Sequence, residues 1–149
     1  MVELVVVVCV GGKRRIYTFI TYITTILYVI PMQTYRDLLL WQKGIELCES
    51  IYVISREFPR EELYALTTQI RRAAVSVPSN IAEGSGRTTR GEFVQSVGHC
   101  RGSLFEVETQ LLVAQRVSYL CKEQIQPLLV LTDEIGRLSS GLIRSLSTA

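Results

Sequence analysis

Residues 93–114, FVQSVGHCRGSLFEVETQLLVA, carry the clearest periodic pattern of this chain. Its apolar residues recur at alternating steps of four and three, the heptad pattern of a helix that buries one face against other helices. The stripe consists of Phe93, Val97, Cys100, Leu104, Val107, Leu111 and Ala114. Thr88 or Thr89 is suited to cap this helix, and Glu92 stands three residues after Thr89, as in a capping box. The pattern predicts a long amphipathic helix.

Three further segments repeat this periodicity. They predict one helix over about 35–58, a second that opens at Glu61-Glu62, and a third over about 122–145. Their stripes are Leu38, Trp41, Ile45, Cys48 and Tyr52; Leu63, Leu66, Ile70, Ala73, Val77 and Ile81; and Leu128, Leu131, Ile135, Leu138 and Leu142. Four apolar stripes with short connections specify an all-α, antiparallel up-down-up-down four-helix bundle over residues 32–149.

Pro78 interrupts the second of these helices. A proline inside a helix removes one backbone hydrogen bond, so the helix either kinks there or stops and restarts. The side chains placed to bond the freed backbone groups are Ser76, Ser79 and Asn80. Gly84 and Gly86 then predict the end of the helix.

Gly98 and Gly102 lie four residues apart inside the helix over 93–114. Each interior glycine costs about 1 kcal/mol of helix stability relative to alanine. Close approach of a neighbouring helix backbone would compensate for this cost. The two glycines therefore predict a tight helix–helix contact, within the chain or with a second subunit.

Residues 1–31 form an apolar N-terminal extension that differs from the rest of the chain. Its Val-rich start and the Ile-, Tyr- and Thr-rich segment 16–30 favour strand over helix. Basic residues precede segment 16–30, as in a membrane anchor, but it is shorter than the roughly 20 residues that a spanning helix needs. Three alternatives remain open: an untranslated extension with the true start at Met32, a membrane-associated segment, or a packed appendage.

The charge distribution limits the classes of partner. The chain of 149 residues has a formal net charge of +2, and from Met32 onward 13 basic residues balance 13 acidic ones. A bundle without a global basic field is poorly suited to strong non-specific nucleic-acid binding. The four cysteines include no CxxC pair, which indicates reduced thiols in the cytoplasm. They are Cys9, Cys48, Cys100 and Cys121.

No residue pattern predicts catalysis, a metal site or a cofactor. His99 is the only histidine and has no glutamate three residues before it, which excludes a di-iron site. Cys100 follows His99 but lies on the apolar stripe, so we interpret it as a core residue. Gly84-Ser85-Gly86 resembles part of a phosphate loop, yet no strand precedes it and no lysine follows, so we interpret it as a helix end.

Five arginines are the candidate nucleic-acid contacts: Arg71, Arg72, Arg87, Arg90 and Arg101. Guanidinium groups on one face would match phosphate oxygens. The alternative is that they pair with glutamates, namely Glu83, Glu92, Glu106 and Glu108. Only one of Arg71 and Arg72 is expected to face solvent, because neighbouring residues point about 100° apart on a helix.

Two stretches carry a family resemblance. Residues 35–43, YRDLLLWQK, and residues 69–87, QIRRAAVSVPSNIAEGSGR, resemble the four-helix-bundle proteins encoded in intervening sequences of bacterial 23S ribosomal RNA genes. These proteins are related to accessory proteins of diversity-generating retroelements. The resemblance covers about 35–146, and its motif residues include Pro78, Asn80, Glu83, Gly84, Gly98 and Gly102.

The resemblance implies a small cytoplasmic protein that assembles as a ring-like homopentamer and has no established enzymatic activity. The retroelement relatives bind nucleic acid and a reverse transcriptase through a strongly basic surface, whereas this bundle is neutral. Our leading hypothesis is therefore a non-catalytic oligomeric bundle that binds RNA or a nucleoprotein partner through its arginines. The alternative is a protein–protein scaffold without a nucleic-acid role.

Overall fold

The computed structural model describes residues 5–10, 13–18 and 34–148. The chain divides into two units, Met1–Pro31 and Met32–Ala149. In the first, β1 (Val5–Val10) pairs with β2 (Lys13–Thr18) as an antiparallel hairpin, with Val5 opposite Thr18 and Val10 opposite Lys13. The β-branched run thus forms the strand expected from its propensity.

Most of the apolar segment 16–30 lies outside the described residues, so the three alternatives for the extension stay open. Within the described ranges, no helix has the length and apolarity that a membrane crossing requires.

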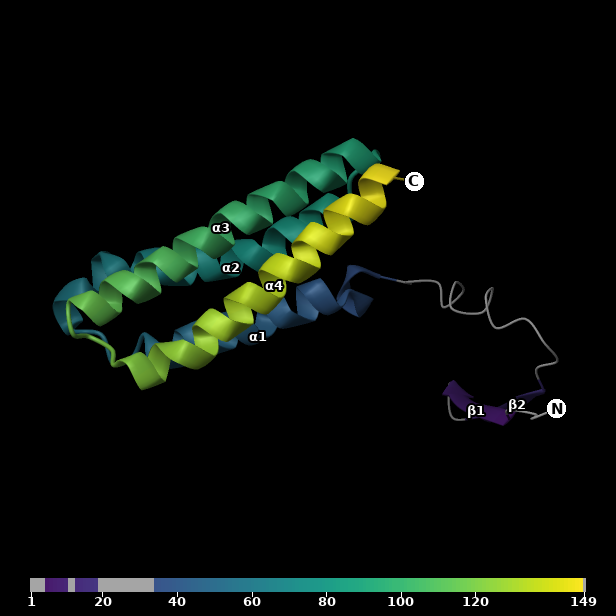
Figure 1. Cartoon of the computed structure of the whole chain (residues 1–149), viewed down its shortest axis with the longest axis horizontal. Helices are drawn as coiled ribbons and strands as arrows, with labels where there is room; N and C mark the ends of the chain where they lie inside the picture. Colours follow the sequence, from purple (N-terminus) through teal and green to yellow (C-terminus); the bar gives the residue numbers. More distant parts are fainter. Residues whose placement is uncertain (1–4, 11–12, 19–33, 149) are drawn as a thin grey trace. The chain divides into compact units, whose positions relative to one another are not determined.

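The second unit consists of four long helices and two short 3₁₀ turns (Figure 1). The helices are α1 (Leu39–Ile54), α2 (Leu66–Ser85), α3 (Arg90–Arg116) and α4 (Lys122–Thr148), and the turns are η2 (Tyr35–Asp37) and η3 (Arg60–Tyr64). Each long helix packs against its neighbour in sequence, and α1 also packs against α4. The sequence colours advance in opposite directions along α3 and α4. The predicted all-α four-helix bundle is confirmed.

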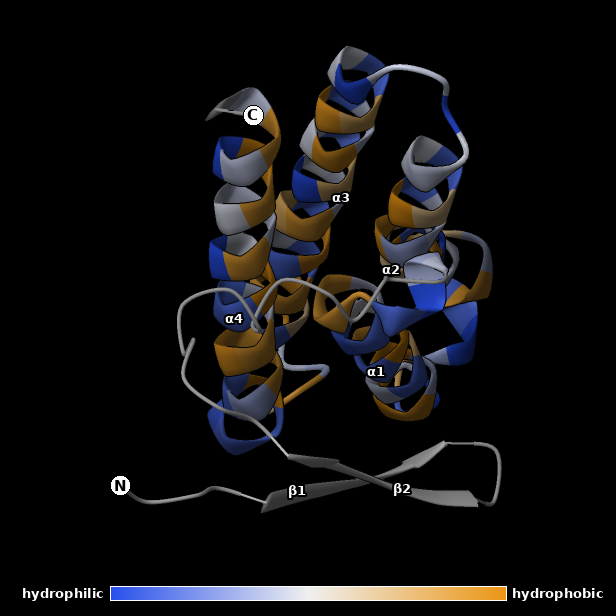
Figure 2. Cartoon of the chain, turned by 90° about the vertical axis from the view of Figure 1, so that its right-hand side faces the viewer, coloured by the Kyte–Doolittle hydropathy of each residue, from blue (hydrophilic) through white to orange (hydrophobic). Residues whose placement is uncertain are grey.

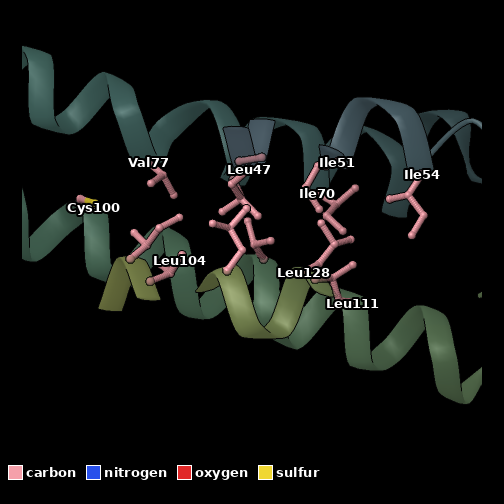
Figure 3. Packing of buried hydrophobic residues seen from close by; sticks show 14 of the residues in the cluster. Leu47, Ile51, Ile54, Ile70, Val77, Cys100, Leu104, Leu111 and Leu128 are labelled. Atoms are coloured by element: carbon pink, nitrogen blue, oxygen red, sulfur yellow. The ribbon is translucent and has the colours of Figure 1, made fainter. Parts of the chain in front are cut away.

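Apolar side chains of all four helices meet in one core (Figure 3). The predicted stripe of the first helix is wrong by one position, because α1 buries Leu40, Leu47, Ile51 and Ile54 whereas Tyr52 is exposed. Leu63, predicted for the second stripe, is also exposed. Six of the seven predicted stripe residues of α3 are buried, and the seventh, Phe93, is half-buried. Leu47, Ile51 and Ile70 are fully buried on the facing helices, and each such side chain contributes about 1.5–3 kcal/mol through its removal from water. Figure 2 shows hydrophobic and hydrophilic residues sharing each helix, as a two-sided helix requires.

The start of α3 has the capping box that the sequence predicted. Of the two threonines considered, Thr89 is the N-cap. The Glu92 backbone N–H donates to Thr89 Oγ1 at 3.2 Å, and the Thr89 N–H donates to Glu92 Oε2 at 3.1 Å. These bonds satisfy backbone donors that a helix start leaves unpaired. The Thr89 hydrogen bonds also lower the pKa of the Glu92 carboxyl.

The predicted bounds of the first two helices are wrong at three ends. Leu38 is extended, with ψ of 119°, so Tyr35–Asp37 forms a separate turn and α1 begins at Leu39. α1 ends at Ile54, four residues before Phe58. α2 begins at Leu66 because the Glu62 carboxylate accepts the Leu66 N–H at 3.1 Å and so caps the helix from outside.

Pro78 does not stop α2, which continues to Ser85. The missing proline N–H leaves the carbonyl of Ala74, four residues earlier, without its helical donor. The Cys48 thiol on α1 donates to this oxygen, with 2.9 Å between Sγ and O. The predicted side chains bond other carbonyls instead: Ser76 bonds Arg72, Ser79 bonds Val75, and Asn80 bonds Ser76. The compensating donor therefore comes from another helix.

Gly44 allows α1 to reach Pro78. A Cβ built on Gly44 would lie 3.2 Å from Pro78 Cβ, tighter than ordinary van der Waals contact. Burial, and to a lesser extent the Glu49 carboxylate, raises the pKa of the Cys48 thiol to about 11. The thiol therefore keeps its proton at neutral pH and remains a donor to Ala74.

The glycines differ in what surrounds them. A Cβ on Gly84 would lie 2.6 Å from Ser96 Cβ and 2.7 Å from the Phe93 ring, so α2 and α3 are in close contact there. Gly98 and Gly102 are exposed, and a Cβ on either would meet nothing within 4 Å. The prediction that they allow a close helix approach within the chain is therefore wrong, because the outer face of α3 has no neighbouring helix in this bundle.

The thiol–carbonyl bond predicts coupling between Cys48 and Pro78. Cys48→Ala should lower the free energy of unfolding by about 1 kcal/mol or more, because it leaves a buried acceptor unpaired. In a Pro78→Ala background the restored backbone N–H donates to the Ala74 carbonyl. Cys48→Ala should then lower the free energy of unfolding much less. Urea unfolding of the four-member cycle measures the difference. Equal effects of Cys48→Ala in both backgrounds would contradict the assignment, and Cys121→Ala, at an exposed cysteine, is the control.

The Gly84 contact predicts that Gly84→Ala destabilises the fold by about 1–3 kcal/mol, because the new methyl group must displace Ser96 or Phe93. Gly91→Ala is the matched control, since a Cβ there meets nothing within 4 Å. Thermal unfolding of both variants tests this, and a Gly84→Ala protein as stable as the control would show that the two helices separate without cost.

Candidate functional site

A groove between α1 and α2 brings two of the five predicted arginines together. Arg71 Nε donates to Ser55 Oγ at 2.7 Å, and Arg71 Cζ lies 5.1 Å from the centroid of the Tyr52 ring. Arg72 is exposed beside it, whereas Arg71 is half-buried, which confirms that only one of the pair faces solvent freely. The groove has a volume of about 450 Å³ and is lined by Tyr52, Thr68, Arg71, Arg72, Val75 and Ser76.

The chemistry of this α1–α2 groove is basic, aromatic and hydroxylic. None of its lining residues is acidic. Tyr52 is 45 % exposed, so this residue remains partly open to solvent beside the guanidinium group. A cation next to an aromatic ring is attracted to the ring face, and together with the Ser55 hydrogen bond this attraction favours one orientation of Arg71.

The other three predicted arginines lie elsewhere. Arg87, in the turn between α2 and α3, forms an ion pair with Glu83, one of the expected glutamate partners. Arg90 is exposed in the first turn of α3. Arg101 lies further along α3, with its Cζ 5.9 Å from the Phe105 ring centroid. The five arginines therefore occupy several separate places rather than one continuous patch.

A second groove, between α3 and α4, contains arginines that sequence reasoning missed. Arg101, Arg137 and Arg144 all line this groove, which has a volume of about 630 Å³ and also includes Phe105, Ile143, Glu108 and Asp133. Arg137 and Arg144 are seven residues apart, a spacing that puts both on one face of a helix. That spacing was the available signal, but the two residues are distant in sequence from the central arginines.

Arg101 has an unusual environment in this α3–α4 groove. Its Nε is buried and has no hydrogen-bond partner among the described residues. Because α1 packs against α2 and α4, while α3 also packs against α2 and α4, the α1–α2 and α3–α4 grooves lie on opposite sides of the bundle. The bundle thus presents two different arginine–aromatic surfaces.

Most motif residues of the resemblance have structural roles in this unit. Pro78 and Gly84 are buried at helix contacts, Asn80 bonds the Ser76 carbonyl, and Glu83 pairs with Arg87. The remaining two, Gly98 and Gly102, lie on the exposed face of α3.

The residues considered for catalysis are not brought together. Cys100 is fully buried, and burial raises the pKa of its thiol to about 12, whereas His99 is exposed. Gly84, Ser85 and Gly86 form the end of α2, as interpreted from the sequence. Among the residues that the structure describes, no three His, Cys, Asp or Glu side chains are placed to hold a metal ion together.

These features define a class: an all-α four-helix bundle with arginine–aromatic grooves on two sides. The sequence pattern of the family described as 23S rRNA-intervening sequence protein matches residues 36–141, so the chain belongs to this family. A crystal structure from Bacteroides thetaiotaomicron, of a protein with unknown function from the S23 ribosomal protein family, has the same fold. The TM-score is 0.66 at 23 % identity, over 70 % of this chain and 98 % of that one. No curated protein matches the chain.

The raised thiol pKa values predict how the cysteines react with iodoacetamide. At pH 8 a thiol of pKa 11 is only about one-thousandth ionised, and the thiolate is the reactive form. Cys48 and Cys100 should therefore stay unmodified while the exposed Cys121 reacts. Cys48 labelling should rise as the pH approaches 11 in protein that remains folded. Peptide mass spectrometry measures each site, and rapid labelling of Cys48 at pH 8 would be inconsistent with a buried, donating thiol.

Proposed function

We propose that this chain is a non-catalytic cytoplasmic protein that self-associates and binds RNA through the α1–α2 groove. The observation that carries the proposal is the placement of Arg71 over Tyr52, with Arg72 beside it and no acidic residue in the lining. Single-stranded nucleic acids bind where cations neutralise phosphates and aromatic rings stack on bases. The groove supplies both kinds of group within one or two helical turns.

Each side chain of the groove has a distinct role in this proposal. Ser55 holds Arg71 through Nε, which leaves the two Nη groups to donate to a phosphate. Arg72 is exposed and contributes a second cation. The open part of the Tyr52 ring offers a stacking surface for a base, while Thr68 and Ser76 line the groove with hydroxyl groups.

RNA is the first nucleic acid to test, because the description of the family, 23S rRNA-intervening sequence protein, refers to a ribosomal RNA. The balanced charge from Met32 onward favours a small local contact over a broad electrostatic surface. Self-association, with the homopentamer of the resemblance as the expected assembly, would cover the exposed glycines of α3. A reverse-transcriptase-like nucleoprotein is the second form of partner that the same groove suits.

A protein scaffold without a nucleic-acid role is the second candidate. The exposed apolar side chains favour it, since Phe105, Val53 and Val130 are each more than half exposed, and exposed apolar surface is typical of protein interfaces. The two candidate functions make different predictions. Only the RNA-binding function predicts that changes in the α1–α2 groove alter the affinity for RNA.

The RNA proposal predicts a loss of affinity and of salt dependence in the double variant Arg71→Ala, Arg72→Ala. Fluorescence anisotropy with a labelled single-stranded RNA should show about tenfold weaker binding. The slope of log affinity against log salt should become shallower by about 1.4, because two phosphate contacts are lost. The double variant Arg116→Ala, Lys122→Ala removes the same charge beside the α3–α4 turn and should bind as the parent does. Equal weakening in both variants would exclude the groove as the RNA contact.

A further inference from the structure

Tyr64 is the most exposed large apolar side chain of the described residues, at 91 %. It ends the short turn η3, next to Leu63, which is 47 % exposed. The turn is held in place because Glu62 accepts the Tyr119 hydroxyl at 3.0 Å and the Leu66 N–H at 3.1 Å. Because the turn is braced, its backbone loses little conformational entropy on binding. An exposed aromatic side chain on such a turn is typical of an interface anchor.

The α3–α4 groove has features that suit a protein segment better than RNA. Its apolar part includes Phe105, which is 54 % exposed, and half-buried Ile143. Glu108 and Asp133 in the lining would repel phosphates, in contrast to the acid-free α1–α2 groove. Arg101 as a whole is only half-buried, although its Nε is enclosed and has no partner among the described residues. A guanidinium group pairs well with a carboxylate.

We propose that the α3–α4 groove receives the η3 turn of a second copy of this chain, with Tyr64 packed on Phe105 and Ile143. This inference rests on the proposed self-association and specifies its surfaces. The exposed Glu61 of the incoming turn supplies the carboxylate for Arg101. The charges complement each other, because the turn carries Arg60 with two glutamates, whereas the groove carries three arginines with two acids.

The two surfaces belong to different parts of one bundle. The hydrogen bond between Glu62 and Tyr119 places η3 beside the turn that joins α3 to α4, at one end of the bundle. The groove instead includes Arg101, in the first half of α3, and Arg144, in the last turns of α4, so it extends toward the other end of the bundle. One copy therefore donates its turn and accepts another copy's turn at a different place, which is a heterologous contact.

The exposed glycines of α3 fit this contact. Gly98 and Gly102 flank Arg101 in sequence and leave open space where a side chain would project. Small residues allow an incoming segment to approach the helix backbone closely. Within the described part of the chain, no helix approaches these two glycines, contrary to the sequence prediction. A second copy that binds in the groove would supply the missing neighbour.

A complementation experiment tests the proposal with the full chain. Tyr64→Ala removes the anchor but keeps the groove, and Arg101→Glu disables the groove but keeps the anchor. In light scattering after size exclusion at micromolar concentration, the parent should be oligomeric and each variant monomeric. An equimolar mixture of the two variants should form a species of twice the mass of one chain, because one intact turn meets one intact groove.

Control variants separate this proposal from the proposed function. Glu49→Arg and Leu39→Ala change an exposed charge and an exposed apolar residue of α1, away from η3 and the α3–α4 groove, and both should assemble as the parent does. A monomeric parent would overturn self-association altogether. If the parent and both variants, Tyr64→Ala and Arg101→Glu, are oligomeric, self-association stands but the assignment of these two surfaces is wrong. The assignment is also wrong if both variants are monomeric and their mixture does not form a dimer. Circular dichroism confirms folding, and Glu61→Arg replaces Tyr64→Ala if the latter does not fold.

Discussion

The contact of α1 with α2 at Pro78 is the constraint on which the candidate site depends. An interior proline leaves the Ala74 carbonyl without a helical donor, and an unpaired buried carbonyl is costly. The Cys48 thiol supplies the donor only because Gly44 lets α1 approach the proline ring. One to two turns further along α1, Tyr52 and Ser55 lie against Arg71. The same helix pair therefore satisfies the backbone and orients the guanidinium group.

Two arginine–aromatic pairs on opposite sides of the bundle differ in their acidic neighbours. The Arg71–Tyr52 pair lies in a groove without acids, whereas the Arg101–Phe105 pair shares its groove with Glu108 and Asp133. Phosphates favour the first environment, and a mixed-charge protein segment favours the second. Separate surfaces would allow a protein with little net charge to bind RNA and to assemble at the same time.

The sequence predicted what periodicity and local capping determine. The α3 stripe and the Thr89–Glu92 box follow from residues within one helix, and both are confirmed. It did not predict the donor for Ala74, because Cys48 lies 26 residues away and only packing brings it near. The sequence also groups Arg101 with Arg71, because the two lie in the same part of the chain. In the fold, Arg101 instead lines a groove with Arg137 and Arg144. Contacts between helices required the three-dimensional arrangement.

The α1–α2 groove is the surface that we propose for RNA. Ultraviolet cross-linking of the full chain to a single-stranded RNA containing 4-thiouridine, followed by peptide mass spectrometry, tests this proposal most directly. RNA bound in this groove should give cross-links at Tyr52 and on the peptide that contains Thr68 to Ser76. Cross-links at Phe105 and along Arg137 to Arg144, with none at Tyr52, would contradict the proposal.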